Sequence, residues 1–380
     1  MVLFTQMLFA LLILLEPMAL EEELKAVEEE ISKTKYNKAT EGHLGRLKAK
    51  LSKLREEAQK KASAKTGGEG FAVKKSGDAS VVLLGFPSVG KSTLLNSLTG
   101  TKSAVASYEF TTLDVVPGTL EYKGATIQIL DVPGVLKGAA SGRGRGKEVL
   151  AVVRNADLVL IMLDVFQLVH YDVLLEELFA AGIRIDSRPP EVTIRKKARG
   201  GIIVSSTVDV GLEEDTIKSI MGEYRIHNAN VVIRENINID MLIDAILGNR
   251  KYIPSIVVIN KIDLADKYSL RDCKEKFPDA LLISADKKTH IDELKELFYQ
   301  KLGFIRIYMK PQGQPADMDE PMIIRYGSSI GDVCDKLHRD FKKRFRYAQV
   351  WGDSAKHKGQ RVGLEHTLYD GDILTIILRK

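Results

Sequence analysis

The chain has 380 residues, of which 44% are hydrophobic and 28% are charged, a composition that is ordinary for a soluble globular protein of two or three domains. Its two cysteines, Cys273 and Cys334, match no zinc-ligand spacing and no disulfide framework, which excludes a small disulfide-stabilised scaffold and suits a reducing cytosol. The formal net charge is only +5, but the basic residues are clustered, and local charge matters more for partners than the sum.

The chain begins with an apolar stretch, MVLFTQMLFALLILLEP, at residues 1–17. The apolar run ends at Leu15, so it is shorter than the ~20 residues that a membrane-spanning helix needs. It also lacks the positive segment and the small-residue cleavage site of a signal peptide. Because Met18 is followed at once by an amphipathic helical pattern, we interpret the stretch as an over-extended translation start. A weak membrane-surface anchor is the alternative, and no stable membrane association is expected.

Residues 18–77 are predicted to form an N-terminal helical region that ends in a linker at 62–77, rich in Ala, Ser, Gly and Lys. Apolar residues recur at helical spacing, and Gly42 and Gly45 predict a bend between two helices. The second helix is basic, which indicates either a solvated face or a hairpin that contacts RNA or an acidic partner. The apolar positions are Leu24, Val27, Ile31, Leu44, Leu47, Leu51 and Leu54, and the basic ones are Arg46, Lys48, Lys50, Lys53, Arg55, Lys60 and Lys61.

From Ser80 onward, short apolar runs alternate with helical stretches. Such runs are typical of strands buried on both faces, and the alternation predicts an α/β domain with a doubly wound parallel sheet at residues 78–302. The segment at about 168–250 has its own strands and basic cluster, which indicates a small α+β domain inserted into the sheet domain. The apolar runs are at 81–86, 125–134, 156–165, 254–263 and 280–285.

The pattern changes again after Leu302, where four strand-like runs surround one expected helix at Ile330–Phe345. Residues 303–380 are therefore predicted to form a compact α+β module. Its basic residues could form an RNA-binding face with Tyr347 and Trp351, and a solvated face is the alternative. The basic residues are Lys342, Lys343, Arg344, Arg346, Lys356 and Lys358.

The segment GFPSVGKS at residues 85–92 fits the pattern G-x-x-x-x-G-K-[ST], directly after a predicted strand and at the start of a helix. The glycines let backbone N–H groups turn toward phosphates where a Cβ would block them, and the helix N-terminus adds its positive dipole. Lys91 can reach the β- and γ-phosphates, and Ser92 can bind Mg²⁺. The segment therefore predicts a P-loop.

The segment NKID at residues 260–263, at the end of another apolar run, indicates which nucleotide base the site binds. The Asp263 carboxylate can accept hydrogen bonds from the ring N–H and the exocyclic amino group of guanine. Adenine offers no such pair of donors and would leave the carboxylate unsatisfied. Ser284 and Ala285, at the next strand end, can close over the guanine O6 through backbone N–H groups. The arrangement predicts guanine specificity.

The segment DVPG at residues 131–134 ends a third strand-like run and fits D-x-x-G. Asp131 is expected to hold Mg²⁺ through water, and the Gly134 N–H to contact the γ-phosphate. Thr111 and Thr112 lie between this motif and the P-loop. We expect Thr112 to complete the Mg²⁺ shell, although both threonines could instead be plain strand-forming residues.

Val135 follows Gly134 at the position where many small GTPases carry a glutamine that orients the attacking water. Valine cannot hydrogen-bond to water, so slow unaided hydrolysis is expected. Help could come from a monovalent cation near the P-loop, from the segment GAASGRGRGKEVL with Arg143 and Arg145, or from a partner in trans. The alternative is that these two arginines are solvated charges or RNA contacts.

The candidate site residues follow from these motifs. Those expected to act in catalysis are Lys91, Thr112 and Gly134, and those expected to bind Mg²⁺ are Ser92, Thr112 and Asp131. Those expected to contact the nucleotide are Gly85, Phe86, Pro87, Ser88, Val89, Gly90, Lys91, Ser92, Thr93, Thr111, Thr112, Asp131, Val132, Pro133, Gly134, Asn260, Lys261, Asp263, Ser284 and Ala285.

From about Leu20 to Lys380, the chain resembles the developmentally regulated GTP-binding proteins, the archaeal and eukaryotic branch of the Obg-related GTPases. The resemblance rests on NKATEGHLGRLKAKL, GFPSVGKSTLLNSLT, YEFTTLDVVPGTLEYKGA, LDVPG, GRGRGKEV, YRIHNANV, NRKYIPSIVVINKID and FIRIYMKPQGQ. It implies an N-terminal helix-turn-helix, a GTPase domain interrupted by an insert similar to ribosomal protein S5, and a C-terminal β-grasp-like TGS domain.

The resemblance also implies GTP and GDP as ligands with Mg²⁺, hydrolysis stimulated by K⁺, and association with ribosomes or RNA in the cytoplasm. It adds Phe110, Val135 and Asp286 to the expected nucleotide contacts. A stabilising or activating protein partner fits the same expectation. One departure is Ser88, because potassium-activated GTPases often have Asn at that P-loop position. The alternative from another class is an RNA- or ribosome-binding scaffold that uses GTP only as a structural ligand.

Overall fold

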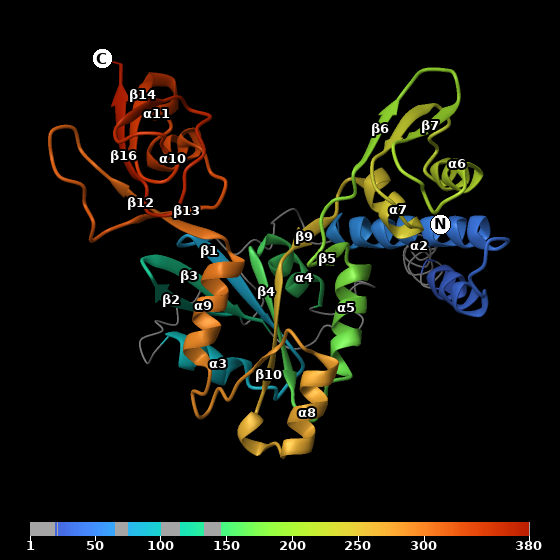
Figure 1. Ribbon diagram of the computed structural model, residues 1–380. Coiled ribbons are helices and arrows are strands. Elements are labelled where there is room, and N and C mark those ends of the chain that lie inside the picture. The colour runs from blue at the N-terminus through green and yellow to red at the C-terminus, as the bar shows by residue number, and fades with distance from the viewer. Residues whose placement is uncertain (1–19, 21, 65–74, 100–114, 133–145, 380) are drawn as a thin grey trace, which may run out of the picture. The chain divides into compact units, whose positions relative to one another are not determined.

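The structure is a computed structural model that describes residues 20, 22–64, 75–99, 115–132 and 146–379 (Figure 1). Among these residues, no helix is both long enough and apolar enough to cross a membrane, and the apolar stretch at 1–17 lies outside them. The chain divides into two compact units. One comprises the described residues within 1–72, 135–154 and 172–253, and the other comprises those within 73–134, 155–171 and 254–380.

The second of these units is built on a six-stranded sheet in the order β11-β10-β4-β1-β3-β2. All neighbours pair in parallel except β2 and β3, which are antiparallel. Strands β1 and β4 are buried along their whole length, as expected for central strands covered on both faces. The predicted α/β class is therefore confirmed. The strands are β1 Ala79–Leu84, β2 Val116–Tyr122, β3 Ala125–Asp131, β4 Leu158–Asp164, β10 Ser255–Asn260 and β11 Leu281–Leu282, and the helices are α3 Lys91–Thr99, η1 Ile262–Leu264, α8 Lys267–Lys276 and α9 Ile291–Lys301.

The same unit ends in a five-stranded sheet in the order β13-β12-β16-β14-β15. The prediction of one helix over 330–345 is wrong. Helix α10 ends at Leu337, because the backbone of His338 is extended although Phe341 continues the apolar spacing, and β14 already begins at Phe345. The elements are β12 Phe304–Met309, β13 Met322–Arg325, α10 Ile330–Leu337, α11 Phe341–Arg344, β14 Phe345–Trp351, β15 Gln360–Val362 and β16 Ile373–Leu378.

The first unit contains the insert, a three-stranded sheet in the order β6-β8-β7 that packs against helices α6 and α7. The two chain segments that enter and leave the insert form the parallel pair β5 and β9. The elements are β5 Ile183–Ile185, β6 Val192–Lys196, β7 Ile202–Ser206, α6 Glu214–Glu223, β8 Ala229–Ile233, α7 Ile239–Leu247 and β9 Lys251–Ile253, and most of α4 (Gly146–Asn155) and α5 (His170–Ala180) also belongs to this unit.

The N-terminal region forms a pair of helices, at residues 22–33 and at α2 (Glu41–Ala64), whose apolar residues pack together. The break lies at 34–40, so the prediction of a bend at Gly42 and Gly45 is wrong. Both glycines lie in α2, where a Cβ at Gly45 would approach the Ile220 side chain of α6 to 2.9 Å. Gly45 therefore permits close helix packing, and neither glycine breaks the helix.

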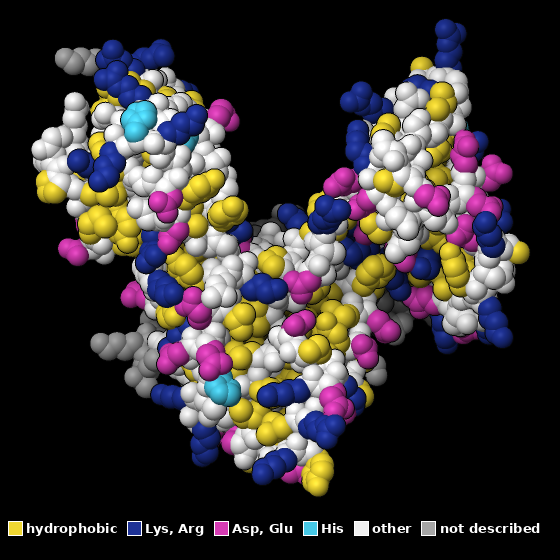
Figure 2. Space-filling view, viewed as in Figure 1, with side chains coloured by type: hydrophobic (Ala, Val, Ile, Leu, Met, Phe, Trp, Pro, Cys, Tyr) yellow, Lys and Arg dark blue, Asp and Glu magenta, His cyan; other side chains and the backbone are white. Residues whose placement is uncertain are grey.

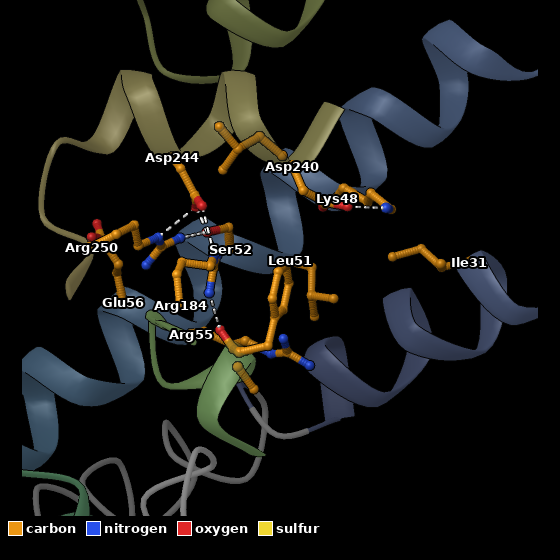
Figure 3. Close-up of a pocket in the computed structure, with 13 residues that line it drawn as sticks. Ile31, Lys48, Leu51, Ser52, Arg55, Glu56, Arg184, Asp240, Asp244 and Arg250 are labelled. Carbon is orange, nitrogen blue, oxygen red and sulfur yellow. Dashed lines mark hydrogen bonds and ion pairs between the residues drawn. The ribbon is translucent and has the colours of Figure 1, made fainter. Parts of the chain in front are cut away.

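A buried aspartate holds three segments of the first unit together (Figure 3). The Asp244 carboxylate of α7 accepts two hydrogen bonds from Arg184 of β5, at 2.6 and 2.7 Å, and one from Arg250 at 2.8 Å. Arg250 also donates to Ser52 of α2 at 2.7 Å. One carboxylate thus compensates two guanidinium groups that are each only 10% exposed.

Replacing Asp244 by alanine is expected to lower the free energy of unfolding by about 3–5 kcal/mol, because it leaves two buried guanidinium groups without a counter-charge. The matched control is Asp240→Ala on the same helix, whose ion pair with Lys48 is about a third exposed and is worth at most ~1 kcal/mol. Urea unfolding of both variants measures the difference. Equal losses of unfolding free energy in the two variants would show that the buried ion cluster stabilises the fold no more than the exposed pair does.

Candidate nucleotide-binding site

The P-loop of the sequence forms a tight turn between β1, which ends at Leu84, and α3, which begins at Lys91. The turn needs backbone conformations that favour glycine, with φ of 99° at Gly90, and Ser88 adopts φ of 65°. A Cβ at Gly85 would lie 2.6 Å from the carbonyl oxygen of Met162 in β4. The glycines are therefore required by the close approach of the loop to its neighbours.

Lys91 lies inside this turn. Its Nζ donates to the carbonyl oxygens of Gly85 at 3.1 Å and Phe86 at 3.3 Å. Burial lowers the pKa of Lys91 below its ordinary value, and the nearby Asp131 carboxylate partly opposes that shift. A partly desolvated cation whose hydrogen bonds in the described chain go to neutral carbonyl groups is well suited to bind an anion such as a phosphate.

Ser92 and Asp131 lie next to each other at the edge of the sheet, where the Ser92 hydroxyl donates to the Asp131 carboxylate at 2.6 Å. Both supply the oxygen ligands that Mg²⁺ prefers. No cluster of three or more His, Cys, Asp or Glu that could hold a metal occurs in the described chain. This fits Mg²⁺, because that ion usually takes only one or two carboxylates and completes its shell with phosphates and water.

Asn260 joins the P-loop to the other end of the predicted site. Its side chain, which is 4% exposed, donates to the Val89 carbonyl at 2.8 Å and accepts from the Ala285 N–H at 2.9 Å. The Asn260 amide also lies 2.5 Å from where a Cβ of Gly90 would be. A buried asparagine with both ends satisfied therefore fixes β10, the P-loop and the 284–286 segment relative to one another.

Lys261 and Asp263 follow Asn260 at the start of η1. Lys261 has φ of 68°, and its Nζ forms an ion pair of 2.7 Å with Asp164 at the end of β4. The Asp263 side chain is exposed. Sequence reasoning missed Asp164, although its position at the end of a buried strand could have identified it.

A second residue that the motifs did not identify is His170, at the start of α5. Its ring stacks on Phe86 of the P-loop, with ring centres 3.9 Å apart and an angle of 17° between the planes. Its Nδ1 is buried, and the described chain offers it no hydrogen-bond partner. The His170 ring therefore covers one face of Phe86, and the carbonyl oxygen of Phe86 accepts a hydrogen bond from Lys91.

The described candidates meet at the carboxyl ends of β1, β3 and β10, with Ser284 and Asp286 on the segment after β11 and buried Val132 directly after β3. Several other candidates are outside the described residues. These are Phe110, Thr111, Thr112, Pro133, Gly134, Val135, Arg143 and Arg145.

The lowered pKa of Lys91 predicts how the stability of the nucleotide-free protein changes with pH. Between that pKa and the ordinary value of 10.5, the unfolded chain holds a proton that the folded chain has lost. The free energy of unfolding must therefore rise with pH across this window. In Lys91→Met the contribution is absent, so the wild type should gain stability relative to the variant as the pH rises toward 10.5. Urea unfolding of both proteins at a series of alkaline pH values measures this gain. A difference in unfolding free energy that stays constant with pH would contradict the expected titration of Lys91.

Three family profiles cover the chain from residue 80 to residue 378. Residues 80–196 match the family described as 50S ribosome-binding GTPase, 199–304 match the C-terminal region of that domain, and 305–378 match the TGS domain.

Individual proteins are similar over almost the whole length. An uncharacterized GTP-binding protein of Methanocaldococcus jannaschii is 59% identical, with 96% of this chain and 94% of that protein aligned. A developmentally-regulated GTP-binding protein 1 homolog of Dictyostelium discoideum is 48% identical over 95% of this chain and 100% of its own. Ribosome-interacting GTPase 1 of Saccharomyces cerevisiae is 46% identical over 94% of this chain and 98% of its own. With its P-loop GTPase domain and its C-terminal TGS domain, the chain belongs to the family of developmentally regulated GTP-binding proteins.

Proposed function

We propose that the chain hydrolyses GTP to GDP and phosphate with Mg²⁺ as its cofactor. The observation that carries this proposal is the meeting of Lys91, Ser92 and Asp131 at the carboxyl ends of β1 and β3. Lys91 would bind the β- and γ-phosphates, and the backbone of the P-loop would surround them. Bound Mg²⁺ supplies positive charge that neutralises the phosphates as the bond to the γ-phosphate breaks. Thr112 and Gly134 remain the proposed contacts to the metal and the γ-phosphate.

The unaided rate is expected to be low, because Val135 offers no hydrogen bond that would orient the attacking water. Phosphate release from GTP over many turnovers, measured in KCl and in NaCl, tests this expectation. We expect slow release that K⁺ accelerates. The control is Ser92→Ala, which removes a proposed metal ligand and leaves Lys91 in place.

Fast hydrolysis without K⁺ or a partner would contradict the expected low rate and show that Val135 does not limit it. A second outcome would contradict the proposed hydrolysis at this site. Equal phosphate release by the wild type and by Ser92→Ala would show that the observed activity does not come from this site. The protein would then be better described as a scaffold that binds GTP without using its hydrolysis.

We further propose that the protein associates with ribosomes or their RNA, which would place it in the cytoplasm. Two similarities support this: the family profile described as 50S ribosome-binding GTPase, and the relative named ribosome-interacting GTPase 1. Sucrose-gradient fractionation of cell extract with GTP, GDP or a non-hydrolysable analogue tests it. Migration with ribosomal particles that depends on the nucleotide is expected, and absence from these particles in all three states would contradict the proposal.

A further inference from the structure

The sheet of the insert has one covered face and one outer face, because side chains alternate along each strand. Val231 and Ile233 of β8 are buried in the core beneath α6 and α7, whereas Asn230 and Arg234 on the opposite face are exposed. The pairing of the strands places Arg195, Asn230 and Ile203 in one row of the outer face, and Thr193, Val232 and Ser205 in the next.

Positive charge exceeds negative charge on this outer face, where the nearest carboxylate, that of Glu191 opposite Arg234, forms its ion pair with Arg188. Arg195 and Arg234 lie on this face, Lys196 ends β6 on the opposite side, and Lys197 and Arg199 lie in the turn between β6 and β7. The three strands contain no Asp or Glu, and no described carboxylate forms an ion pair with any of these five cations. Figure 2 shows Lys and Arg side chains gathered along the β6 side of the insert and at the end where β6 turns into β7.

The basic cluster on α2 differs from this face in one decisive respect. Lys48 is paired with Asp240, Lys50 with Glu23 and Arg55 with Glu28, at 2.6 to 2.8 Å. A phosphate that bound these cations would have to displace carboxylates already in contact. For these three cations the structure therefore favours a solvated, paired face over a direct RNA contact. The cations of the insert carry no such cost.

The chemistry of the face also indicates which form of nucleic acid it suits. Strands β6, β7 and β8 have no aromatic residue, so the face lacks the rings on which unpaired bases stack. Its most exposed apolar side chain is that of Ile203, which is 51% exposed and lies beside Asn230 of β8 and two residues from Ser205 on its own strand. Three strands span about 10 Å, a width that can lie along the wide, shallow minor groove of an RNA double helix.

We propose that the outer face of the insert's sheet binds the sugar–phosphate backbone of double-helical RNA. Arg195, Arg199 and Arg234 contact phosphates, and Ile203 lies against ribose. The binding is independent of base sequence, because none of these groups reads a base edge. This proposal rests on the RNA association proposed above and assigns it to a particular surface.

The test uses the full-length protein and a fluorescently labelled RNA duplex of about 20 base pairs, long enough for two successive minor grooves. The face variant combines Arg195→Gln, Arg199→Gln and Arg234→Gln. The control combines Lys218→Gln, Arg271→Gln and Lys276→Gln, which removes the same charge from exposed helix positions whose cations pair with acids one turn away. Fluorescence anisotropy over a series of salt concentrations gives the affinity and its salt dependence, and binding of a fluorescent GTP analogue verifies that each variant is folded.

The face variant should bind about 100-fold more weakly at ~0.1 M salt, and its slope of log affinity against log salt should be shallower by about 2–3. The control should stay within about twofold of the wild type with an unchanged slope, because its three cations make no phosphate contact. Equal weakening of both variants would overturn the proposal, because general charge would then explain the binding.

Two further outcomes separate this proposal from the one on which it rests. If the wild type and the face variant bind the duplex equally well, RNA binds elsewhere and only the assignment to this face fails. Preference for single-stranded RNA over the duplex would point instead to the C-terminal module, where Lys310 lies over the Trp351 ring at 4.7 Å. If the wild type binds neither the duplex nor ribosomal particles, the proposed RNA association itself fails.

Discussion

Gly90→Ala is expected to weaken GTP binding by about 100-fold or more, because the added methyl group would lie 2.5 Å from the Asn260 amide. Either Asn260 or the loop must then move, and the loop carries Lys91, whose amine must reach the phosphates. Asn260 cannot move without cost, since its two buried hydrogen bonds hold Val89 and Ala285. The φ of 99° at Gly90 adds strain for any residue with a Cβ.

The control for this substitution is Gly313→Ala. Gly313 lies in the same unit and also has a positive φ, of 77°, but a Cβ there would meet no atom within 4 Å. It therefore carries a comparable backbone strain without the collision. Titration of a fluorescent GTP analogue should show normal affinity for Gly313→Ala and a large loss for Gly90→Ala. Similar affinities for the two variants would show that the contact between Gly90 and Asn260 does not organise the site.

The parts of the site that the sequence identified are those with local signals. The P-loop, D-x-x-G and NKID segments each follow a short apolar run, and β1, β3 and β10 end within two or three residues of where those runs predicted. Buried parallel strands lack alternation, so a run of Val, Leu and Ile is itself the signal. Glycine spacing then fixes the turn, because few other residues tolerate its backbone angles.

The parts that were missed depend on contacts between distant segments. Strand β2 contains Pro117 and Gly118, a residue pair that is typical of turns. It is nevertheless an antiparallel edge strand, and α3 packs closely on it. A Cβ at Gly118 would lie 2.7 Å from a Leu95 methyl group, so that glycine serves packing. The stack of His170 on Phe86 likewise joins residues far apart in the sequence. No local pattern encodes such a pair.

Asp263→Asn is expected to lower the affinity for GTP by about 1000-fold and to raise the affinity for xanthosine triphosphate. The carboxylate of Asp263 can accept both the ring N–H and the amino group of guanine, and the asparagine amide would direct a donor at that amino group. Both hydrogen bonds then lose their charged acceptor, and a hydrogen bond to a charged group is worth about 1.5–3 kcal/mol. Xanthine carries a carbonyl group in place of the amino group, so it can accept a hydrogen bond from the new amide.

The control is Asp279→Asn, which makes the same change of charge at another exposed position of the same unit. Competition of GTP, ATP and xanthosine triphosphate against a fluorescent nucleotide measures all three affinities for each protein. Because the Asp263 side chain is exposed in this structure, its replacement should leave the fold and the phosphate contacts of Lys91 intact. The gain for xanthosine triphosphate is the decisive outcome, since general damage to the site can weaken GTP but cannot strengthen another nucleotide. A variant that loses GTP without this gain would show that Asp263 does not contact the base.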